Sequence, residues 1–339
     1  MKFKERIPVT VLTGFLGAGK TTLLNQLLSQ KHGYKCAIII NEFGPISIDN
    51  QLVLGADEEI VELNNGCLCC RVRGDLIKSL ANLFKKQKRF DYVLVETTGL
   101  ADPGPVAQTF FMPELAKTLR LDAIVTVVDA KHIETMLDEA PEAPRQIAFA
   151  DVVLLNKTDL VAREELERLE ERIHKMNSIA QIIRTKRAEI DFAKVLNIKA
   201  RDLTAAADLG EAVVEHEHEH EHGHDGHGHG HEDDHEHHEH QDDVRSLYFS
   251  EERPLDLKKL EAWLSELLTN KGPQLYRSKG IFHIQGEPKR VVFQGVQMIF
   301  EAEPDRFWKP DETRRSQLVF IGKDLDEAEL SRGFANCLA

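Results

Sequence analysis

Apolar and polar positions alternate along this chain in a way that predicts strands separated by helices. The strand candidates are short apolar runs rich in β-branched residues, near 7–12, 36–40, 91–95, 122–128 and 151–155. Leucines recur at helical spacing in 22–30, and a helical pattern also covers 161–176. Strands that alternate with helices predict an α/β domain with a mostly parallel sheet and helices on both faces.

The pattern changes after residue 243. Strands are predicted there at 245–250, 275–285, 290–294 and 317–321, with helices at 255–268 and 324–335. This order predicts a smaller α+β domain, and a length of 339 residues agrees with two domains. We place the first domain at 1–210, a linker at 211–243 and the second domain at 244–339.

The linker carries nearly all of the net charge. Residues 211–243 hold thirteen acidic side chains and no Lys or Arg, whereas the whole chain has a formal charge of −14. Outside the linker, 44 acidic side chains balance 43 basic ones. The folded parts are therefore nearly neutral and lack the clustered basic charge that nucleic-acid binding requires, so no nucleic-acid partner is expected.

A phosphate-binding loop is predicted between the first strand and the first helix. Residues 14–21 match the P-loop pattern G-x-x-x-x-G-K-[ST] at every fixed position. Glycines let backbone N–H groups curl around phosphate oxygens, the lysine reaches the β- and γ-phosphates, and the threonine hydroxyl can bind Mg²⁺. The alternative is a glycine-rich turn without a ligand. The candidate nucleotide-binding residues here are Gly14, Gly17, Ala18, Gly19, Lys20, Thr21 and Thr22.

A second motif predicts that the base is guanine. The apolar run 151–155 ends in Asn156-Lys157-Thr158-Asp159, the N-K-x-D pattern. The carboxylate of Asp159 can accept hydrogen bonds from guanine N1–H and from the exocyclic amine, which adenine cannot supply. Asn156, Lys157 and Asp159 therefore join the predicted nucleotide site.

The strand at 91–95 leads into Glu96-Thr97-Thr98-Gly99. An acidic residue at this strand end is where P-loop proteins place a group that helps to hold Mg²⁺. We assign Glu96 to Mg²⁺, with a turn cap as the alternative, and Gly99 to the γ-phosphate. Lys20 and Glu96 are candidate catalytic residues. The sequence identifies no residue that would position the attacking water, so slow intrinsic turnover of GTP is expected.

Three thiols in four residues, Cys67-Leu68-Cys69-Cys70, predict a soft-metal site between the two nucleotide motifs. Thiolates suit Zn²⁺ or Cu(I), and no second cysteine pair completes a structural zinc site. The open coordination position favours metal transfer or sensing. A disulfide is the alternative, but a bridge between the neighbours Cys69 and Cys70 is strained. Cys36 and Cys337 are expected to be packed thiols.

The linker is a second candidate for metal binding. Twelve of the sixteen histidines lie there, and no apolar residue occurs between Val214 and Val244. A segment that cannot bury a core is expected to be disordered. It is either a solvated linker or an auxiliary reservoir for Zn²⁺, Ni²⁺, Co²⁺ or Cu²⁺. Its histidines are His216, His218, His220, His222, His224, His227, His229, His231, His235, His237, His238 and His240.

The first residues are not expected to form a signal peptide, because Lys2, Lys4, Glu5 and Arg6 interrupt any apolar segment. No apolar run reaches transmembrane length. We therefore expect a cytoplasmic protein with reduced thiols and no membrane partner.

Taken together, these motifs resemble the CobW-like family of P-loop GTPases, of the CobW/HypB/UreG type, in its zinc-linked branch. The resemblance spans nearly the whole chain. It implies a metallochaperone in which the C-x-C-C cysteines bind zinc or a related metal and GTP hydrolysis drives delivery. It rests on Gly14–Thr21, Asn41-Glu42-Phe43-Gly44, the cysteine motif, Glu96–Gly99, Asn156–Asp159 and Tyr276-Arg277-Ser278-Lys279-Gly280.

The resemblance also implies roles for two acidic residues. Glu42 would join the metal site, and Asp49 would lie near Mg²⁺ or the attacking water, so both are candidate catalytic residues. Glu42 follows the strand at 36–40, in a loop expected to face the γ-phosphate. An exposed loop acid is the alternative. The predicted metal ligands are Glu42, Cys67, Cys69 and Cys70, and the predicted Mg²⁺ ligands are Thr21, Asp49 and Glu96.

The leading prediction is a GTPase metallochaperone that uses GTP/GDP, Mg²⁺ and a transition metal, Zn²⁺ or else Co²⁺ or Ni²⁺. Its partner would be a client metalloprotein, and a nucleotide- or metal-dependent homodimer is expected. One alternative is a metal-buffering protein in which the linker stores metal and the GTPase domain regulates it. Another is a factor of cobalamin metabolism. A kinase is disfavoured by N-K-x-D and the thiols, and a GTPase acting on RNA by the neutral surface.

Overall fold

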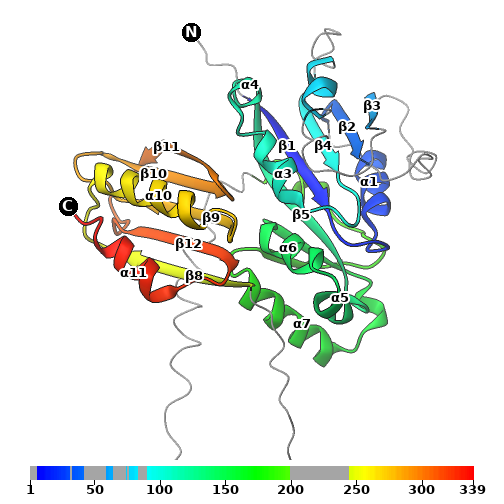
Figure 1. Ribbon diagram of the computed structural model, residues 1–339. Coiled ribbons are helices and arrows are strands. Elements are labelled where there is room, and N and C mark those ends of the chain that lie inside the picture. The colour runs from blue at the N-terminus through cyan, green and yellow to red at the C-terminus, as the bar shows by residue number, and fades with distance from the viewer. Residues whose placement is uncertain are drawn as a thin grey trace, which may run out of the picture.

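Two sheets lie side by side in the molecule, each with its own covering helices (Figure 1). The computed structural model of the chain describes residues 6–30, 33–41, 59–63, 74, 76–82, 90–198 and 244–339. The first sheet belongs to the N-terminal part of the chain and the second begins at Val244.

In the described residues, the N-terminal sheet has seven strands in the order β3-β2-β4-β1-β5-β6-β7. Every neighbouring pair is parallel, so the carboxyl ends of all these strands meet at one edge of the sheet. The strands are β1 (Ile7–Thr13), β2 (Cys36–Asn41), β3 (Glu59–Leu63), β4 (Tyr92–Glu96), β5 (Leu119–Asp129), β6 (Val152–Asn156) and β7 (Gln181–Arg184).

Helices cover both faces of this sheet, which confirms the predicted α/β fold. One face packs against α1 (Lys20–Ser29) and residues 188–198 in an apolar cluster. The opposite face packs against most of the remaining helices. These are α3 (Pro103–Thr109), α4 (Pro113–Ala116), α5 (Ile133–Glu139), α6 (Glu142–Phe149) and α7 (Arg163–Met176), with short 3₁₀ turns η2 (Thr158–Leu160) and η3 (Phe192–Lys194) elsewhere. Residues 76–82 are also helical.

The C-terminal sheet is antiparallel, in the order β11-β10-β9-β12-β8. Two helices, α10 (Leu257–Lys271) and α11 (Glu327–Ala335), pack on one of its faces through a separate apolar cluster. The strands are β8 (Val244–Glu251), β9 (Leu275–Phe282), β10 (Lys289–Val296), β11 (Ile299–Phe307) and β12 (Ser316–Lys323). The predicted smaller α+β domain is confirmed.

Three strands were not predicted, namely β3, β7 and β11. β11 contains Pro304 and alternates acidic with apolar residues, so its sequence does not resemble a buried strand. It lies at the edge of the sheet, a position where proline is tolerated within a strand. The last helix begins at Glu327 rather than 324, because the Asp326 side chain caps it by accepting from the Glu329 N–H at 2.9 Å.

The two domains share one core. Val244, Tyr276, Val296, Val319 and Ile321 of the C-terminal domain belong to the same buried cluster as the apolar residues of α6 and α7. Helix α6 therefore lies between the two sheets (Figure 1).

Candidate nucleotide site

The loop between β1 and α1 is built around close backbone approaches. Gly14 has φ = 139°, and a Cβ there would lie 2.2 Å from the Val127 carbonyl oxygen, so only glycine fits. The Lys20 ammonium donates to the carbonyl oxygens of Gly14 at 2.8 Å and Phe15 at 3.2 Å. These bonds hold the ammonium over the loop, at the N-terminus of α1, where backbone N–H groups favour phosphate.

Two of the predicted Mg²⁺ ligands meet beside this loop. The Thr21 hydroxyl donates to Glu96 Oε1 at 3.3 Å, because β4 and β1 are neighbours and Glu96 ends β4. Glu96 is buried. A hydroxyl and a carboxylate are hard oxygen donors of the kind that Mg²⁺ prefers, so these residues fit the ion. The third predicted ligand, Asp49, lies outside the described residues.

The loop after β4 packs directly on the P-loop. A Cβ at Gly99 would lie 2.5 Å from Leu16 Cδ2 and 2.7 Å from the Leu16 backbone nitrogen, so a side chain there would force the two loops apart. The Thr97 N–H also donates to the Leu12 carbonyl at 2.9 Å. This arrangement brings Gly99 beside the loop that is predicted to hold the phosphates.

Asn156 is a structural link rather than an exposed contact for the base. Its Nδ2 donates to the Ala18 carbonyl in the P-loop at 2.9 Å. Its Oδ1 accepts from the Thr185 hydroxyl at 3.1 Å and from the Ala188 N–H at 2.8 Å. The buried amide therefore ties the phosphate loop to the segment that follows β7.

The remaining guanine candidates lie at the end of β6. Lys157 has φ = 61° and Asp159 lies exposed in η2. The Lys157 ammonium donates to Asp129 Oδ2 at 2.7 Å, and His132 Nδ1 lies 2.9 Å from the same oxygen. Sequence analysis missed Asp129, although an acid that ends the strand next to β6 is a usable signal. Burial alone would raise the pKa of Asp129, but the hydrogen bonds from Lys157 and His132 outweigh it and lower this pKa.

We expect the change Asp129→Asn to weaken GDP binding by about tenfold, because the neutral amide loses a charge-assisted bond that aligns the N-K-x-D turn. Since the pKa of Asp129 is lowered below 3.8, its carboxylate stays ionised at any pH above about 4, and this contact gives no pH dependence near neutrality. Calorimetric titration with GDP measures the loss. Asp138→Asn is the control, because Asp138 pairs with Arg172 away from the loop; an equal loss in both variants would contradict the role of Asp129.

The predicted transition-metal residues, Glu42, Cys67, Cys69 and Cys70, lie outside the described residues, as do the twelve histidines of the linker. Among the residues that the structure describes, no group of three or more His, Cys, Asp or Glu side chains is arranged to hold a metal ion. Cys36 and Cys337 are buried thiols. Burial raises the pKa of Cys337 to about 11, which makes it a poor metal ligand at neutral pH.

Comparison of this chain with known proteins agrees with a nucleotide-binding site in the N-terminal domain. The family model for the CobW/HypB/UreG nucleotide-binding domain matches residues 8–184, more than half of the chain. The chain belongs to this family. The model for the cobalamin synthesis protein CobW C-terminal domain matches residues 244–338. The resemblance inferred from the motifs is thus confirmed.

Similar proteins of the CobW/HypB/UreG family carry names that refer to zinc. The zinc chaperone YjiA of Escherichia coli is 38% identical over 97% of this chain and 98% of its own length. The zinc-regulated GTPase metalloprotein activator 1 of Schizosaccharomyces pombe is 34% identical over 95% of this chain and 83% of its own. A crystal structure of zinc-bound YjiA GTPase from E. coli covers 99% of this chain and 100% of that chain, with 31% identity and a TM-score of 0.71. The predicted GTPase class is confirmed by these relatives.

Among the described residues, no helix is both long and apolar enough to cross a membrane.

Proposed function

We propose that this protein hydrolyses GTP and couples that reaction to the binding and delivery of a transition metal, most simply Zn²⁺, to a client metalloprotein. The cargo metal would bind at Cys67, Cys69 and Cys70 with Glu42. The zinc-related names of the relatives support the choice of metal, and they favour delivery over a role confined to cobalamin metabolism.

The nucleotide half of the proposal uses residues whose geometry is compatible with Mg²⁺·GTP. Lys20 would neutralise charge on the β- and γ-phosphates, and Thr21 and Glu96 would hold Mg²⁺, which supplies charge stabilisation when bound. Gly99 would bring its N–H to the γ-phosphate, and Asp159 would accept hydrogen bonds from guanine. Asp49 remains a proposed contributor near Mg²⁺ or the attacking water.

The observation that carries the coupling is the strand order β3-β2-β4-β1. Strands β2 and β3 are parallel and end side by side, with Asn41 opposite Leu63 in the register. Glu42 follows β2 directly and Cys67 follows β3 by four residues. Because β2 also neighbours β4, the two segments that carry the proposed metal ligands leave the sheet at the edge where Glu96 and the P-loop lie. Loops that leave one sheet edge from neighbouring strands are suited to respond to the same γ-phosphate.

We expect stoichiometric Zn²⁺ to change the GTP hydrolysis rate of a protein that lacks residues 215–241, and the change Cys69→Ser to remove that response. Deleting the histidines leaves the cysteine loop as the proposed high-affinity site, and serine is a weak ligand for zinc. Phosphate release with and without Zn²⁺ measures the effect.

Cys337→Ser is the matched control, because the Cys337 thiol donates to the Gly333 carbonyl at 3.2 Å and a serine hydroxyl can donate in its place. This variant should keep the zinc response. If Zn²⁺ has no effect on hydrolysis even though the cysteines are intact, the proposed coupling is wrong.

A second candidate function is favoured by the density of histidines in the linker. Metal buffering by His216 to His240, regulated by the GTPase domain, predicts that deletion of 215–241 removes most of the metal capacity. A chaperone instead retains about one tightly bound metal after the deletion.

A homodimer that forms with nucleotide or metal remains part of the proposal, and sedimentation with GDP and with a GTP analogue tests it.

A further inference from the structure

The loop that carries Gly99 is held by helix α6. The Gln146 side chain is buried, and its Nε2 donates to the carbonyl oxygens of Gly99 at 3.0 Å and Ala101 at 3.1 Å. The next residue back, Arg145, donates to Asp102 Oδ2 at 3.2 Å. Two consecutive residues of α6 therefore form hydrogen bonds with the centre of the loop and with its end, where Asp102 caps α3.

The same helix supports the C-terminal domain. Arg145 lies over the ring of Tyr276 in β9, 5.8 Å from its centroid, and Phe149 packs against that ring with centroids 5.5 Å apart. Arg145 thus contacts Asp102 of the Gly99 loop and Tyr276 of the C-terminal domain at the same time. Cation–π and aromatic contacts of this kind depend on geometry, so a shift of α6 changes them.

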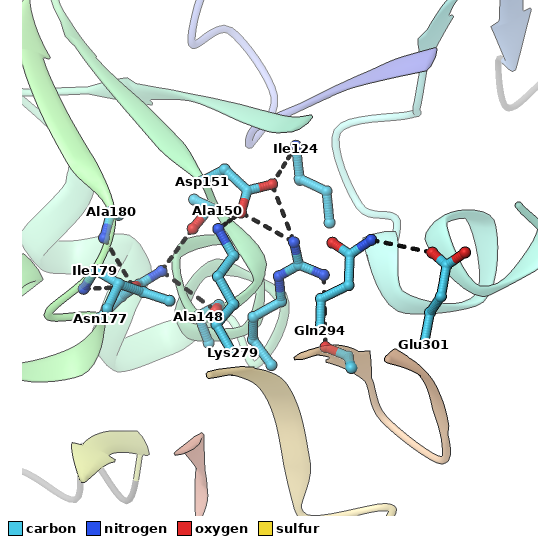
Figure 2. Close-up of polar contacts among 12 residues, drawn as sticks. Ile124, Ala148, Ala150, Asp151, Asn177, Ile179, Ala180, Lys279, Gln294 and Glu301 are labelled. Carbon is cyan, nitrogen blue, oxygen red and sulfur yellow. Dashed lines mark hydrogen bonds and ion pairs between the residues drawn. The ribbon is translucent and has the colours of Figure 1, made fainter. Parts of the chain in front are cut away.

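A buried cluster of charged side chains lies just after α6 in the chain. Asp151 Oδ1 lies 3.0 Å from the guanidinium of Arg277, which is on β9. The same oxygen lies 2.5 Å from the ammonium of Lys279, also on β9 (Figure 2). All three side chains are at most 5% exposed. Asp151 Oδ2 also accepts from the Ile124 N–H of β5 at 2.8 Å.

The C-terminal end of α6 is fixed by Asn177, whose side-chain amide donates to the carbonyl oxygen of Ile147 at 2.8 Å. It also donates to the carbonyl oxygens of Ala148 at 3.3 Å and Ala150 at 2.9 Å (Figure 2). The terminal carbonyls of a helix have no partners within the helix, so this cap removes a usual source of fraying. The segment from Arg145 to Asp151 is therefore a short rigid piece, bonded to the Gly99 loop at one end and to β9 at the other.

We infer that α6 and the residues that follow it, through Arg145, Gln146 and Asp151, convey the presence of the γ-phosphate from the Gly99 loop to β9, so that the position of the C-terminal domain differs between GTP and GDP. The inference rests on the proposed nucleotide site, because it requires Gly99 to contact the γ-phosphate. A loop drawn toward that phosphate either pulls Gln146 with it or breaks two buried hydrogen bonds, and the second outcome is costly. Shifts of whole helices by 1–2 Å are a common response to ligands.

Thermodynamic linkage adds a second consequence. If GTP and GDP favour different positions of β9 on α6, then the position of β9 must in turn affect the ratio of the affinities for a GTP analogue and for GDP. A substitution at the α6–β9 contact should therefore alter this affinity ratio. Gln146 and Arg145 act here as positioning residues, since they touch the loop and not the nucleotide. The C-terminal domain would then sense the nucleotide without contributing a residue to its site.

Hydrogen exchange in the full-length protein tests the inference, with Mg²⁺ and either GDP or a non-hydrolysable GTP analogue. We expect exchange of the amides in 275–282 to differ about fivefold or more between the two nucleotides, a magnitude typical of coupled sites. The variant Gln146→Leu should still bind GDP but should lose this difference, because the Gly99 loop is no longer bonded to α6.

Gln108→Leu is the matched control. Gln108 is a buried glutamine on α3 that donates to Gln297 Oε1 of the C-terminal domain at 2.7 Å, without bonding to the Gly99 loop. It should keep the nucleotide difference. If Gln146→Leu does not fold, Tyr276→Leu replaces it, since that change cuts the path at β9 and should alter the GTP-analogue to GDP affinity ratio.

Three results overturn the inference. The first is a wild-type protein that binds both nucleotides with equal exchange in 275–282. The second is a Gln146→Leu variant that keeps the difference, and the third is a Tyr276→Leu variant with an unchanged affinity ratio. A wild-type protein that binds neither nucleotide would instead overturn the proposed function, so the two failures are distinguishable.

Discussion

Replacing Asp151 with alanine is expected to lower the free energy of unfolding by about 3–5 kcal/mol, because the change leaves two buried cations without their carboxylate. Asp151 is the anion shared by Arg277 and Lys279 across the domain interface. Denaturation by urea measures the loss. Tryptophan fluorescence reports on the relevant part of the molecule, since both Trp263 and Trp308 belong to the C-terminal domain.

The cluster also predicts how stability depends on pH. Burial alone would raise the pKa of Asp151, but Arg277 and Lys279 outweigh it and lower this pKa below 3.8, so its contribution is present above about pH 4 and is lost in acid. Burial lowers the pKa of Lys279 from 10.5, and Asp151 only partly offsets this effect. Between that lowered pKa and 10.5, Lys279 binds more protons in the unfolded chain than in the folded one, so its contribution to the free energy of unfolding rises with pH in this window.

The variant Lys279→Met is the control for the predicted loss of stability and for the predicted pH dependence. It keeps most of the side-chain volume and leaves the pair of Asp151 with Arg277 intact, so its free energy of unfolding should stay within about 1 kcal/mol of the wild-type value. The alkaline rise in stability should disappear in this variant. A wild-type unfolding curve for Asp151→Ala would mean that the buried ions do not hold the two domains together.

The change Asp159→Asn is expected to weaken GTP binding by roughly 10²–10⁴-fold, since two hydrogen bonds to a carboxylate are worth about 1.5–3 kcal/mol each. Xanthosine triphosphate should bind this variant better than GTP does. Xanthine carries a carbonyl where guanine carries its exocyclic amine, and the asparagine amide can donate to that oxygen. Competition against a fluorescent nucleotide measures both affinities.

The position of Asp159 makes this a clean test. The side chain is exposed in η2, so the change should move the free energy of unfolding by no more than about 0.5 kcal/mol. Asp191→Asn is the control, because Asp191 caps the comparable 3₁₀ turn η3 and asparagine caps equally well. An Asp159→Asn variant that retains GTP affinity and rejects xanthosine triphosphate would remove Asp159 from the base site.

Most of the fold was predictable from the sequence because its signals are local. Buried parallel strands such as β5 and β6 are continuous apolar runs, and α1 and α7 repeat their apolar positions at helical spacing. The strands that escaped prediction lie at or next to sheet edges, where one side of the strand needs no partner. β7 has four residues and β11 contains a proline, so neither has the pattern of a buried strand.

The nucleotide site was predictable only as far as it is contiguous. The P-loop and N-K-x-D are each read within a few residues, and the structure brings Thr21 and Glu96 together from separate motifs. Asp129, Gln146 and Asp151 act through residues distant in the chain, and no spacing rule pairs them with Lys157, Gly99 or Lys279. Arg277 and Lys279 are visible in the family motif 276–280, but their carboxylate partner is apparent only once β6 and β9 are folded together.

The bonding of Asn156 has a consequence for redesign of base preference. Its amide bonds to Ala18 in the P-loop as well as to Thr185 and Ala188 beyond β7. A substitution at Asn156 would disturb the phosphate-binding loop together with the proposed base site. We therefore expect every nucleotide to lose affinity, whichever base it carries. Engineering of a new base specificity should therefore leave Asn156 unchanged and start from Asp159, the proposed base contact, whose side chain is exposed.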